Sequence, residues 1–191
     1  MTQEQISLQS NDVLMVVDIQ NDFCPGGALP IPRGDEVVPV ANFWIQAARS
    51  KQIPVYCSRD FHPREHPSFV EQGGDWPPHC IQETWGAEFH PDLNVPETAR
   101  IVTKGVRFDK DQNSVFEETG LAHRLERDGT GRLIVLGLAL DVCVRASVLD
   151  GLGAGFEVSV ILDGCRAVTE ESGSNTIREL EEAGANCISG G

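Results

Sequence analysis

Three reactive side chains follow apolar runs at separate places in the sequence: Asp18, Lys104 and Cys143. The carboxyl ends of parallel strands open on one edge of a sheet, so we expect the three to meet in one crevice. There the carboxylate can accept the thiol proton and later return it to a leaving group, while the ammonium stabilises the charged forms. The set predicts a thiol nucleophile activated without histidine. Taken singly, each residue also has an ordinary interpretation as a cap, a solvated charge or a core residue.

Cys143 lies where the pattern changes from strand to helix. An apolar run at 133–136 predicts a buried strand, and after Cys143 the apolar residues recur at helical spacing. Free N–H groups and the helix dipole at such a helix start favour a thiolate, the nucleophilic form of cysteine. The alternative is a small apolar residue at a strand end, which is the commoner use of cysteine.

A second constellation lies in the loop sequence that follows another predicted strand. Asp60 and His62 are two residues apart, which places both side chains on one side of an extended segment. His79 can complete a facial site of one carboxylate and two histidines, which suits zinc, manganese or ferrous iron. The alternative is a loop that merely contains histidines, and we assign His66 and His90 to structural or exposed positions.

The elements that must position these residues alternate between strand and helix. Apolar runs predict strands at 13–17, 54–57, 101–103, 133–136, 157–162 and 186–188. Helical spacing predicts helices at 35–50, 121–127 and 174–183, besides the helix after Cys143. This alternation predicts an α/β fold with a mostly parallel sheet. The irregular segment at 61–99 is long for a compact domain, and loops of that length are usually functional.

Length and composition limit the class of protein. With 191 residues, 40% of them hydrophobic, the chain is expected to form a single domain over 1–191, with a metal-binding loop region at about 60–100. The formal net charge of −14 argues against a nucleic-acid or membrane surface. No signal peptide or membrane span is apparent, and the six scattered cysteines are expected to be reduced, which predicts a cytoplasmic protein.

Five segments spread along the chain resemble a known family. They are VVDIQNDFCPGGAL at 16–29, SRDFHPREHPSF at 58–69, WPPHCIQETWGAEFHPDL at 76–93, VTKG at 102–105 and GLALDVCVRASVLDGLGAGFEV at 137–158. In this order they resemble the cysteine hydrolases of the isochorismatase-like superfamily, and within it the nicotinamidases, also called pyrazinamidases. RDFH followed by WPPHC favours the nicotinamidases, because isochorismatases and carbamoylsarcosine amidases lack that metal set.

The resemblance implies a fold and a reaction. The fold would be a doubly wound sheet of six strands in the order 3-2-1-4-5-6, with helices on both faces. The reaction would be metal-dependent hydrolysis of nicotinamide to nicotinate and ammonia through a thioester, as part of NAD salvage, with pyrazinamide as a further substrate. We expect no nucleotide cofactor, no nucleic-acid partner and no membrane partner. Family members vary in oligomeric state, so a homo-oligomer stays open.

The resemblance also assigns roles to residues. Asp18, Lys104 and Cys143 would form the catalytic triad. Asp60, His62 and His79 would bind one divalent metal ion, for which we prefer zinc over iron or manganese. A cis peptide bond between Leu138 and Ala139 would aim the backbone N–H groups of Ala139 and Cys143 at the oxyanion.

Ring recognition is implied as well. Phe23 and Trp76 would sandwich the pyridine ring, and His66 matches a position where some members carry an additional metal-related side chain. The chain departs from the family at Val142, where relatives carry tyrosine or histidine. We expect this departure to affect the polarity of the pocket and the range of substrates.

Three alternatives remain at this point. The first is a cysteine hydrolase of the same superfamily that acts on another small amide and lacks the metal. The second is a non-catalytic metal-binding domain with a structural Cys143, although three ligands are fewer than structural zinc usually has. The third is a serine α/β hydrolase, which the absence of a G-x-S-x-G motif opposes.

Overall fold

A six-stranded sheet forms the centre of the molecule. The computed structural model describes residues 6–189, and all neighbouring strands within that range pair in parallel in the order β3-β2-β1-β4-β5-β6. The strands are β1 Asp12–Val17, β2 Val55–Asp60, β3 Arg100–Lys104, β4 Arg132–Leu138, β5 Glu157–Arg166 and β6 Asn186–Ile188. The predicted order 3-2-1-4-5-6 is confirmed.

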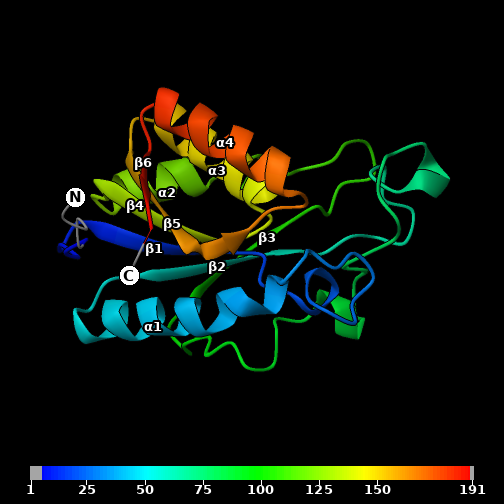
Figure 1. Ribbon diagram of the computed structural model, residues 1–191, viewed down its shortest axis with the longest axis horizontal. Coiled ribbons are helices and arrows are strands. Elements are labelled where there is room, and N and C mark those ends of the chain that lie inside the picture. Colours follow the sequence, from blue (N-terminus) through cyan, green and yellow to red (C-terminus); the bar gives the residue numbers. More distant parts are fainter. Residues whose placement is uncertain (1–5, 190–191) are drawn as a thin grey trace.

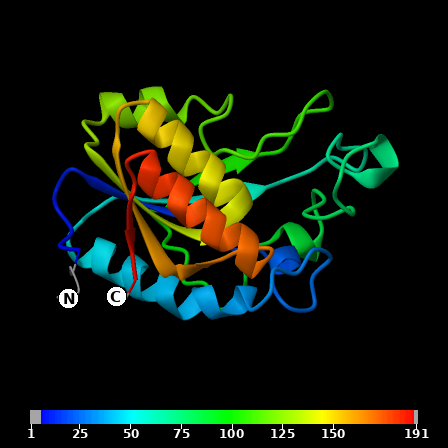
Figure 2. The same ribbon diagram turned by 45° about the horizontal axis from the view of Figure 1, so that its top comes forward.

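Helices cover both faces of this sheet, as predicted. They are α1 Val37–Ser50, α2 Leu121–Arg127, α3 Arg145–Gly153 and α4 Glu170–Glu182. In Figure 1, α1 lies along one face, whereas α2, α3 and α4 lie on the other. The turned view in Figure 2 keeps α3 and α4 side by side, across the sheet from α1.

The apolar sequence of β1 explains why this strand lies at the centre of the sheet. All six of its residues are buried, and it pairs with β2 on one side and β4 on the other. A strand covered on both faces needs a continuous apolar run rather than an alternating one. The strands all run the same way, so their carboxyl ends share one edge, beside which the long loops gather at the right of Figure 1.

Several element boundaries differ from the predictions. The helix predicted at 174–183 begins at Glu170, because the Thr169 side chain accepts a hydrogen bond from the Ser172 N–H and the Ser172 side chain bonds back in a capping box. The strand predicted at 157–162 continues to Arg166, because after a register shift β5 pairs again with β4 at Cys165. The helix predicted from Asp35 begins as a short 3-10 turn at Gly34–Glu36.

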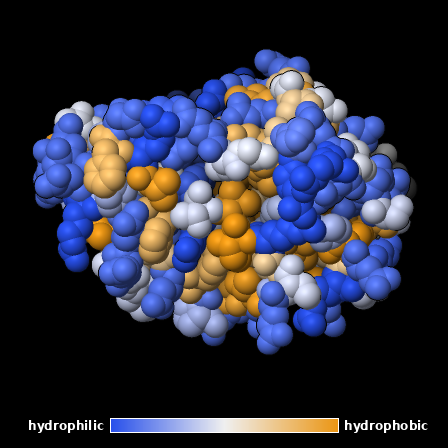
Figure 3. Space-filling model, turned by 180° about the vertical axis from the view of Figure 1, so that it is seen from behind, coloured by the Kyte–Doolittle hydropathy of each residue, from blue (hydrophilic) through white to orange (hydrophobic). Residues whose placement is uncertain are grey.

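The surface carries some apolar residues. Seen from behind, apolar residues gather near the middle of one face among polar ones (Figure 3). The large apolar side chains most exposed in the described range are Phe43, Val70, Trp85, Ile101, Val106 and Phe108. Association between copies of the chain would bury apolar surface of this kind. A homo-oligomer remains a prediction. Within residues 6–189 no helix combines the length and apolarity that a membrane crossing requires.

The α4 cap gives a direct test of the observed helix start. Thr169→Ala removes the acceptor of the capping box and should lower the free energy of unfolding by about 1 kcal/mol. Ser174→Ala is the matched control, because Ser174 lies inside the observed helix and should change stability by less than about 0.5 kcal/mol. Urea unfolding of both variants measures the difference. Equal midpoints would contradict the capping role of Thr169.

Candidate active site

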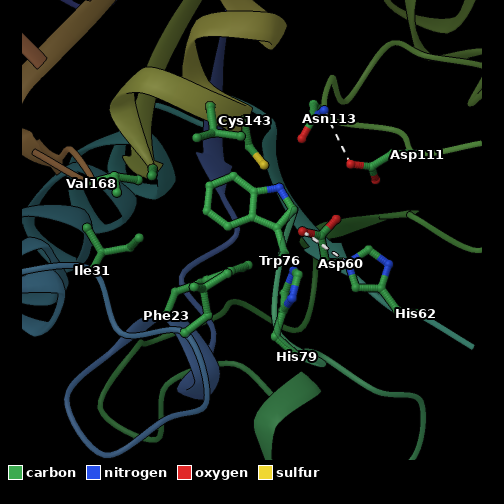
Figure 4. A pocket seen from close by; sticks show the side chains of 13 residues that line it. Phe23, Ile31, Asp60, His62, Trp76, His79, Asp111, Asn113, Cys143 and Val168 are labelled. Carbon is green, nitrogen blue, oxygen red and sulfur yellow. Dashed lines mark hydrogen bonds and ion pairs between the residues drawn. The ribbon is translucent and has the colours of Figure 1, made fainter. Parts of the chain in front are cut away.

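A cleft opens at the carboxyl edge of the sheet and contains the predicted chemistry. The space in and around it, open solvent included, amounts to about 400 Å³. Figure 4 shows Cys143 at one end and Asp60 with His62 and His79 at the other. The cleft is lined by Phe23, Leu29, Ile31, Asp60, His62, Trp76, His79, Asp111, Asn113, Ala139, Val142, Cys143 and Val168.

The structure brings the predicted triad together around the buried ammonium of Lys104. Its Nζ lies 2.8 Å from Asp18 Oδ2 and 3.3 Å from Cys143 Sγ. The same Nζ lies 2.6 Å from Asp60 Oδ1, so Lys104 contacts both the predicted triad and the predicted metal-ligand set. Lys104 and Asp18 are fully buried and Cys143 is 4% exposed. The predicted convergence of three strand ends is therefore what the fold produces.

Burial and charge set the proton equilibria of this cluster. Burial by itself would lower the pKa of Lys104, but Asp18 and Asp60 raise it well above the ordinary value, so the amine stays charged. Burial raises the pKa of Asp18, with Lys104 opposing that effect. Burial also raises the pKa of Cys143 well above the usual thiol value, against the effect of Lys104. This shift opposes the thiolate that a helix start favours, so removal of the thiol proton calls for a base.

The turn that presents Cys143 is irregular. β4 ends at Leu138, and the peptide bond between Leu138 and Ala139 is cis, as the resemblance implies. A π-helical turn, Leu140–Val144, then leads into α3, where an ordinary α-helical turn was expected. Single π-helical turns of this kind are frequent at functional sites. The turn places Ala139 and Cys143 together in the cleft wall.

The three predicted metal ligands also converge. The candidate ligand atoms of Asp60, His62 and His79 all lie within 4.8 Å of one another, and the three residues are buried. Asp60 presents its two oxygens to different partners: Oδ1 lies against Lys104, whereas Oδ2 lies 3.7 Å from His62 Nε2. Burial would raise the pKa of Asp60, but Lys104 and His62 lower it, which keeps this carboxylate charged.

Hydrogen bonds fix which ring nitrogens can bind a metal. His62 Nδ1 lies 2.8 Å from the carbonyl oxygen of Gly105, and His79 Nδ1 lies 2.8 Å from that of Pro77. A carbonyl oxygen only accepts, so each Nδ1 carries the proton and each Nε2 keeps a lone pair. Backbone contacts of this kind orient metal-binding histidines. The donor set therefore fits a divalent cation.

Two nearby residues affect the His62 ring. The His66 ring stacks on it with centroids 4.0 Å apart, so His66 is buried beside the ligand set rather than exposed, although it is not one of the three convergent donors. Gly105 has a φ of +66°, and a Cβ there would lie 2.3 Å from His62 Cε1. Glycine is the residue that fits at this position. His90, by contrast, bonds the backbone of its own loop and of Ile19.

The predicted ring-binding residues line the cleft. Phe23 is buried in the 3-10 turn Asn21–Phe23, and its ring lies 5.5 Å from that of His79. The half-buried Trp76 extends its indole across the cleft between Cys143 and Phe23 (Figure 4). Ile31 and Val168 lie beside Phe23 and complete an apolar wall. Val142, where the chain departs from the family, also lines the cleft.

Sequence reasoning missed three polar residues that hold the site in place. Ser58 Oγ donates to Asp18 Oδ1 over 2.6 Å. Gln20 bonds both the N–H and the carbonyl of Asp60, each over 2.8 Å. Asp22 Oδ2 accepts from the N–H of Cys80, next to His79, over 2.7 Å. The available signal for Gln20 and Asp22 was the short polar stretch that follows the buried strand at 13–17.

Two further residues of the cleft were also missed, Asp111 and Asn113. Both lie in the segment between β3 and α2, and they form a polar wall across from the apolar wall (Figure 4). Nothing in their spacing marks them in the sequence, because the segment has no periodicity and many charges.

Comparison with known proteins relates this site to a family. The model of the isochorismatase domain matches residues 12–190. The nicotinamidase of Escherichia coli strain K12 is 39% identical, and the match covers 90% of this chain and 92% of that protein.

Solved structures resemble this fold closely. The pyrazinamidase of Pyrococcus horikoshii, in complex with zinc, superposes with a TM-score of 0.91 at 40% identity and covers 94% of this chain and 99% of its own. PnC1 from L. infantum, in complex with nicotinate, superposes with a TM-score of 0.88 at 34% identity and covers 96% of each chain. With its sheet order, its buried Asp18–Lys104–Cys143 cluster and these relatives, the chain belongs to the isochorismatase family.

Proposed function

We propose that this chain is a nicotinamidase that hydrolyses nicotinamide to nicotinate and ammonia through a thioester on Cys143. The observation that carries the proposal is the contact of one buried ammonium, Lys104, with both the thiol of Cys143 and the metal-ligand carboxylate of Asp60. The nicotinamidase from E. coli and the structure with nicotinate support this substrate. Pyrazinamide, whose ring has the same size as that of nicotinamide, would be a further substrate. The reaction would serve NAD salvage in the cytoplasm.

Thiol activation follows from the buried cluster. Asp18, held by Ser58 and Lys104, accepts the proton of the Cys143 thiol, and the thiolate attacks the carboxamide carbon. The raised pKa of Asp18 suits this work, because a carboxylate with an elevated pKa is a stronger base. Lys104 remains charged throughout and stabilises the thiolate as it forms.

The remaining steps use the same groups. The backbone N–H groups of Ala139 and Cys143 stabilise the oxyanion, and loss of one such donor typically costs about 100- to 1,000-fold in rate. Asp18 returns the proton to the amide nitrogen, the carbon–nitrogen bond breaks, and ammonia leaves. Asp18 then takes a proton from water, which attacks the thioester. The carbon–sulfur bond breaks, Asp18 gives its proton to the sulfur of Cys143, and the acid product loses its proton to solvent and leaves as nicotinate.

Asp60, His62 and His79 would hold one divalent ion, for which we propose zinc. Zinc accepts three protein ligands and leaves a position open, and the solved relative with zinc supports this choice. When bound, the ion supplies a Lewis acid that can fix the ring nitrogen of the substrate. Phe23 and Trp76 would hold the two faces of the ring.

Ammonia release from nicotinamide tests the function directly. The purified protein should release ammonia, lose this activity when a chelator removes the metal, and regain it when zinc is added back. The donor set Asp60–His62–His79 predicts this dependence. Activity that a chelator leaves unchanged would separate catalysis from the metal. Absence of turnover in folded, zinc-loaded protein would contradict the nicotinamide assignment.

Cys143→Ala tests the covalent scheme. The variant should lose turnover by at least about 1,000-fold, because the nucleophile is gone, while it still binds one zinc ion per chain. Cys187→Ala is the matched control, because Cys187 is a half-buried thiol on β6 away from the cleft, and it should keep full activity. Substantial turnover by Cys143→Ala would rule out the thioester.

Gly105→Ala tests the metal-ligand set without changing a ligand. The added Cβ would clash with the His62 ring, so zinc affinity should fall by about tenfold or more. Gly120→Ala is the matched control, because Gly120 has a similar φ of +72° and open space around it. Zinc titration against a competing chelator measures both. Equal affinities in the two variants would show that the His62 position does not matter for binding.

A further inference from the structure

Asp111 and Asn113 form a polar wall in the cleft. Neither residue belongs to the proposed triad or to the proposed metal-ligand set. Figure 4 shows this polar wall facing the apolar wall of Phe23 and Val168, with Asn113 near the Cys143 end. Polar groups that line an otherwise apolar pocket usually fix the orientation of a ligand. This wall can therefore contact a polar group of the substrate.

The segment that carries this wall is anchored on both sides of Asn113. Gln112 and Ser114 are buried, and Gln112 Nε2 donates to the carbonyl of Glu117 over 2.8 Å. The N–H of Val115 donates over 3.0 Å to Ser147 Oγ, which lies in α3, the helix that follows Cys143. Asn113 is thus fixed relative to the nucleophile before substrate arrives, which lowers the entropic cost of using it in binding.

Asp111 determines which end of the Asn113 amide faces the cleft. Asn113 Nδ2 is directed at Asp111 Oδ2 over 3.5 Å. A carboxylate only accepts hydrogen bonds, so the amide nitrogen faces Asp111 and Oδ1 is turned into the cleft, as in Figure 4. Within residues 6–189, Asn113 Oδ1 accepts no hydrogen bond. The wall thus offers an oriented acceptor in the same cleft as Cys143.

We propose that Asn113 is a specificity-determining residue whose Oδ1 accepts a hydrogen bond from the NH2 group of the substrate carboxamide. The inference rests on the proposed function, because a carboxamide at Cys143 is what that function requires. With the carbonyl oxygen at the N–H groups of Ala139 and Cys143, the NH2 group presents two donors. Asp18 accepts a hydrogen bond from one of these donors, and Asn113 Oδ1 accepts a hydrogen bond from the other.

An acceptor at this position discriminates among ligands that share the pyridine ring. A primary amide satisfies it, whereas an ester has no N–H donor and leaves the acceptor unpaired. The carboxylate oxygens of the product nicotinate accept hydrogen bonds and donate none. Asn113 Oδ1 is also an acceptor, so the two groups repel each other. Asn113 would therefore favour the amide substrate over the acid product at the same ring site.

A comparison of an amide and an ester isolates this contact. We would measure kcat/KM for nicotinamide and for methyl nicotinate, and the inhibition constant of nicotinate, in the zinc-loaded full chain. Asn113→Leu keeps the size of the side chain and removes the acceptor. It should lower kcat/KM for the amide about tenfold relative to the ester, and nicotinate should inhibit more tightly.

Two further variants complete the design. Asp111→Asn keeps Asn113 but removes the carboxylate that orients it, so the preference for the amide should fall in the same direction by a smaller factor. This variant also tests the inference if Asn113→Leu does not fold. Val168→Ala alters the apolar wall without removing a polar group, so it should change kcat/KM for both substrates by the same factor.

The outcomes separate the inference from the function on which it rests. An unchanged amide-to-ester ratio in both Asn113→Leu and Asp111→Asn, with nicotinamide still hydrolysed, would overturn the role of Asn113 alone. A fall in the ratio in Val168→Ala as large as that in Asn113→Leu would overturn it too. A wild-type chain that hydrolyses no nicotinamide would instead contradict the proposed function.

Discussion

The buried ammonium of Lys104 is the interaction on which the rest of the site depends. It contacts Asp18, Asp60 and Cys143 within 2.6–3.3 Å, so one cation stabilises the proposed base, a proposed metal ligand and the proposed nucleophile. A charge in a low-dielectric interior is stable only with compensating partners, and removing one partner of a buried pair typically costs about 3–5 kcal/mol. The triad and the metal-ligand set are therefore a single electrostatic unit rather than two neighbouring sites.

The same burial that holds this unit together also sets its chemistry. It raises the pKa of Cys143, so the thiol is stored in its neutral, less reactive form, and it raises the pKa of Asp18, so the neighbouring carboxylate becomes a better base. A proton can then move between two groups already in place when the amide carbon arrives. Burial in this cluster serves reactivity as well as stability.

The scaffold around the unit is built from polar residues that bond the backbone. Gln20 and Asp22 follow β1 directly and hold the segments that carry Asp60 and His79. Buried backbone groups in a long loop need such partners, because no regular ladder satisfies them. The irregular segment between β2 and β3 therefore has hydrogen-bond partners where it meets the site, and these partners position the proposed metal ligand His79.

The sequence by itself determined the strands, their parallel arrangement and the strand-end positions of Asp18, Lys104 and Cys143, because apolar runs and parallel topology follow local rules. Its motifs also predicted the three candidate metal ligands, whose side chains the fold brings together. Only the tertiary structure decided that Lys104 contacts both Cys143 and Asp60, that burial raises the pKa of Cys143 and that Asn113 lines the cleft. These features depend on burial and on contacts between segments distant in sequence, which leave no periodic signal in the chain.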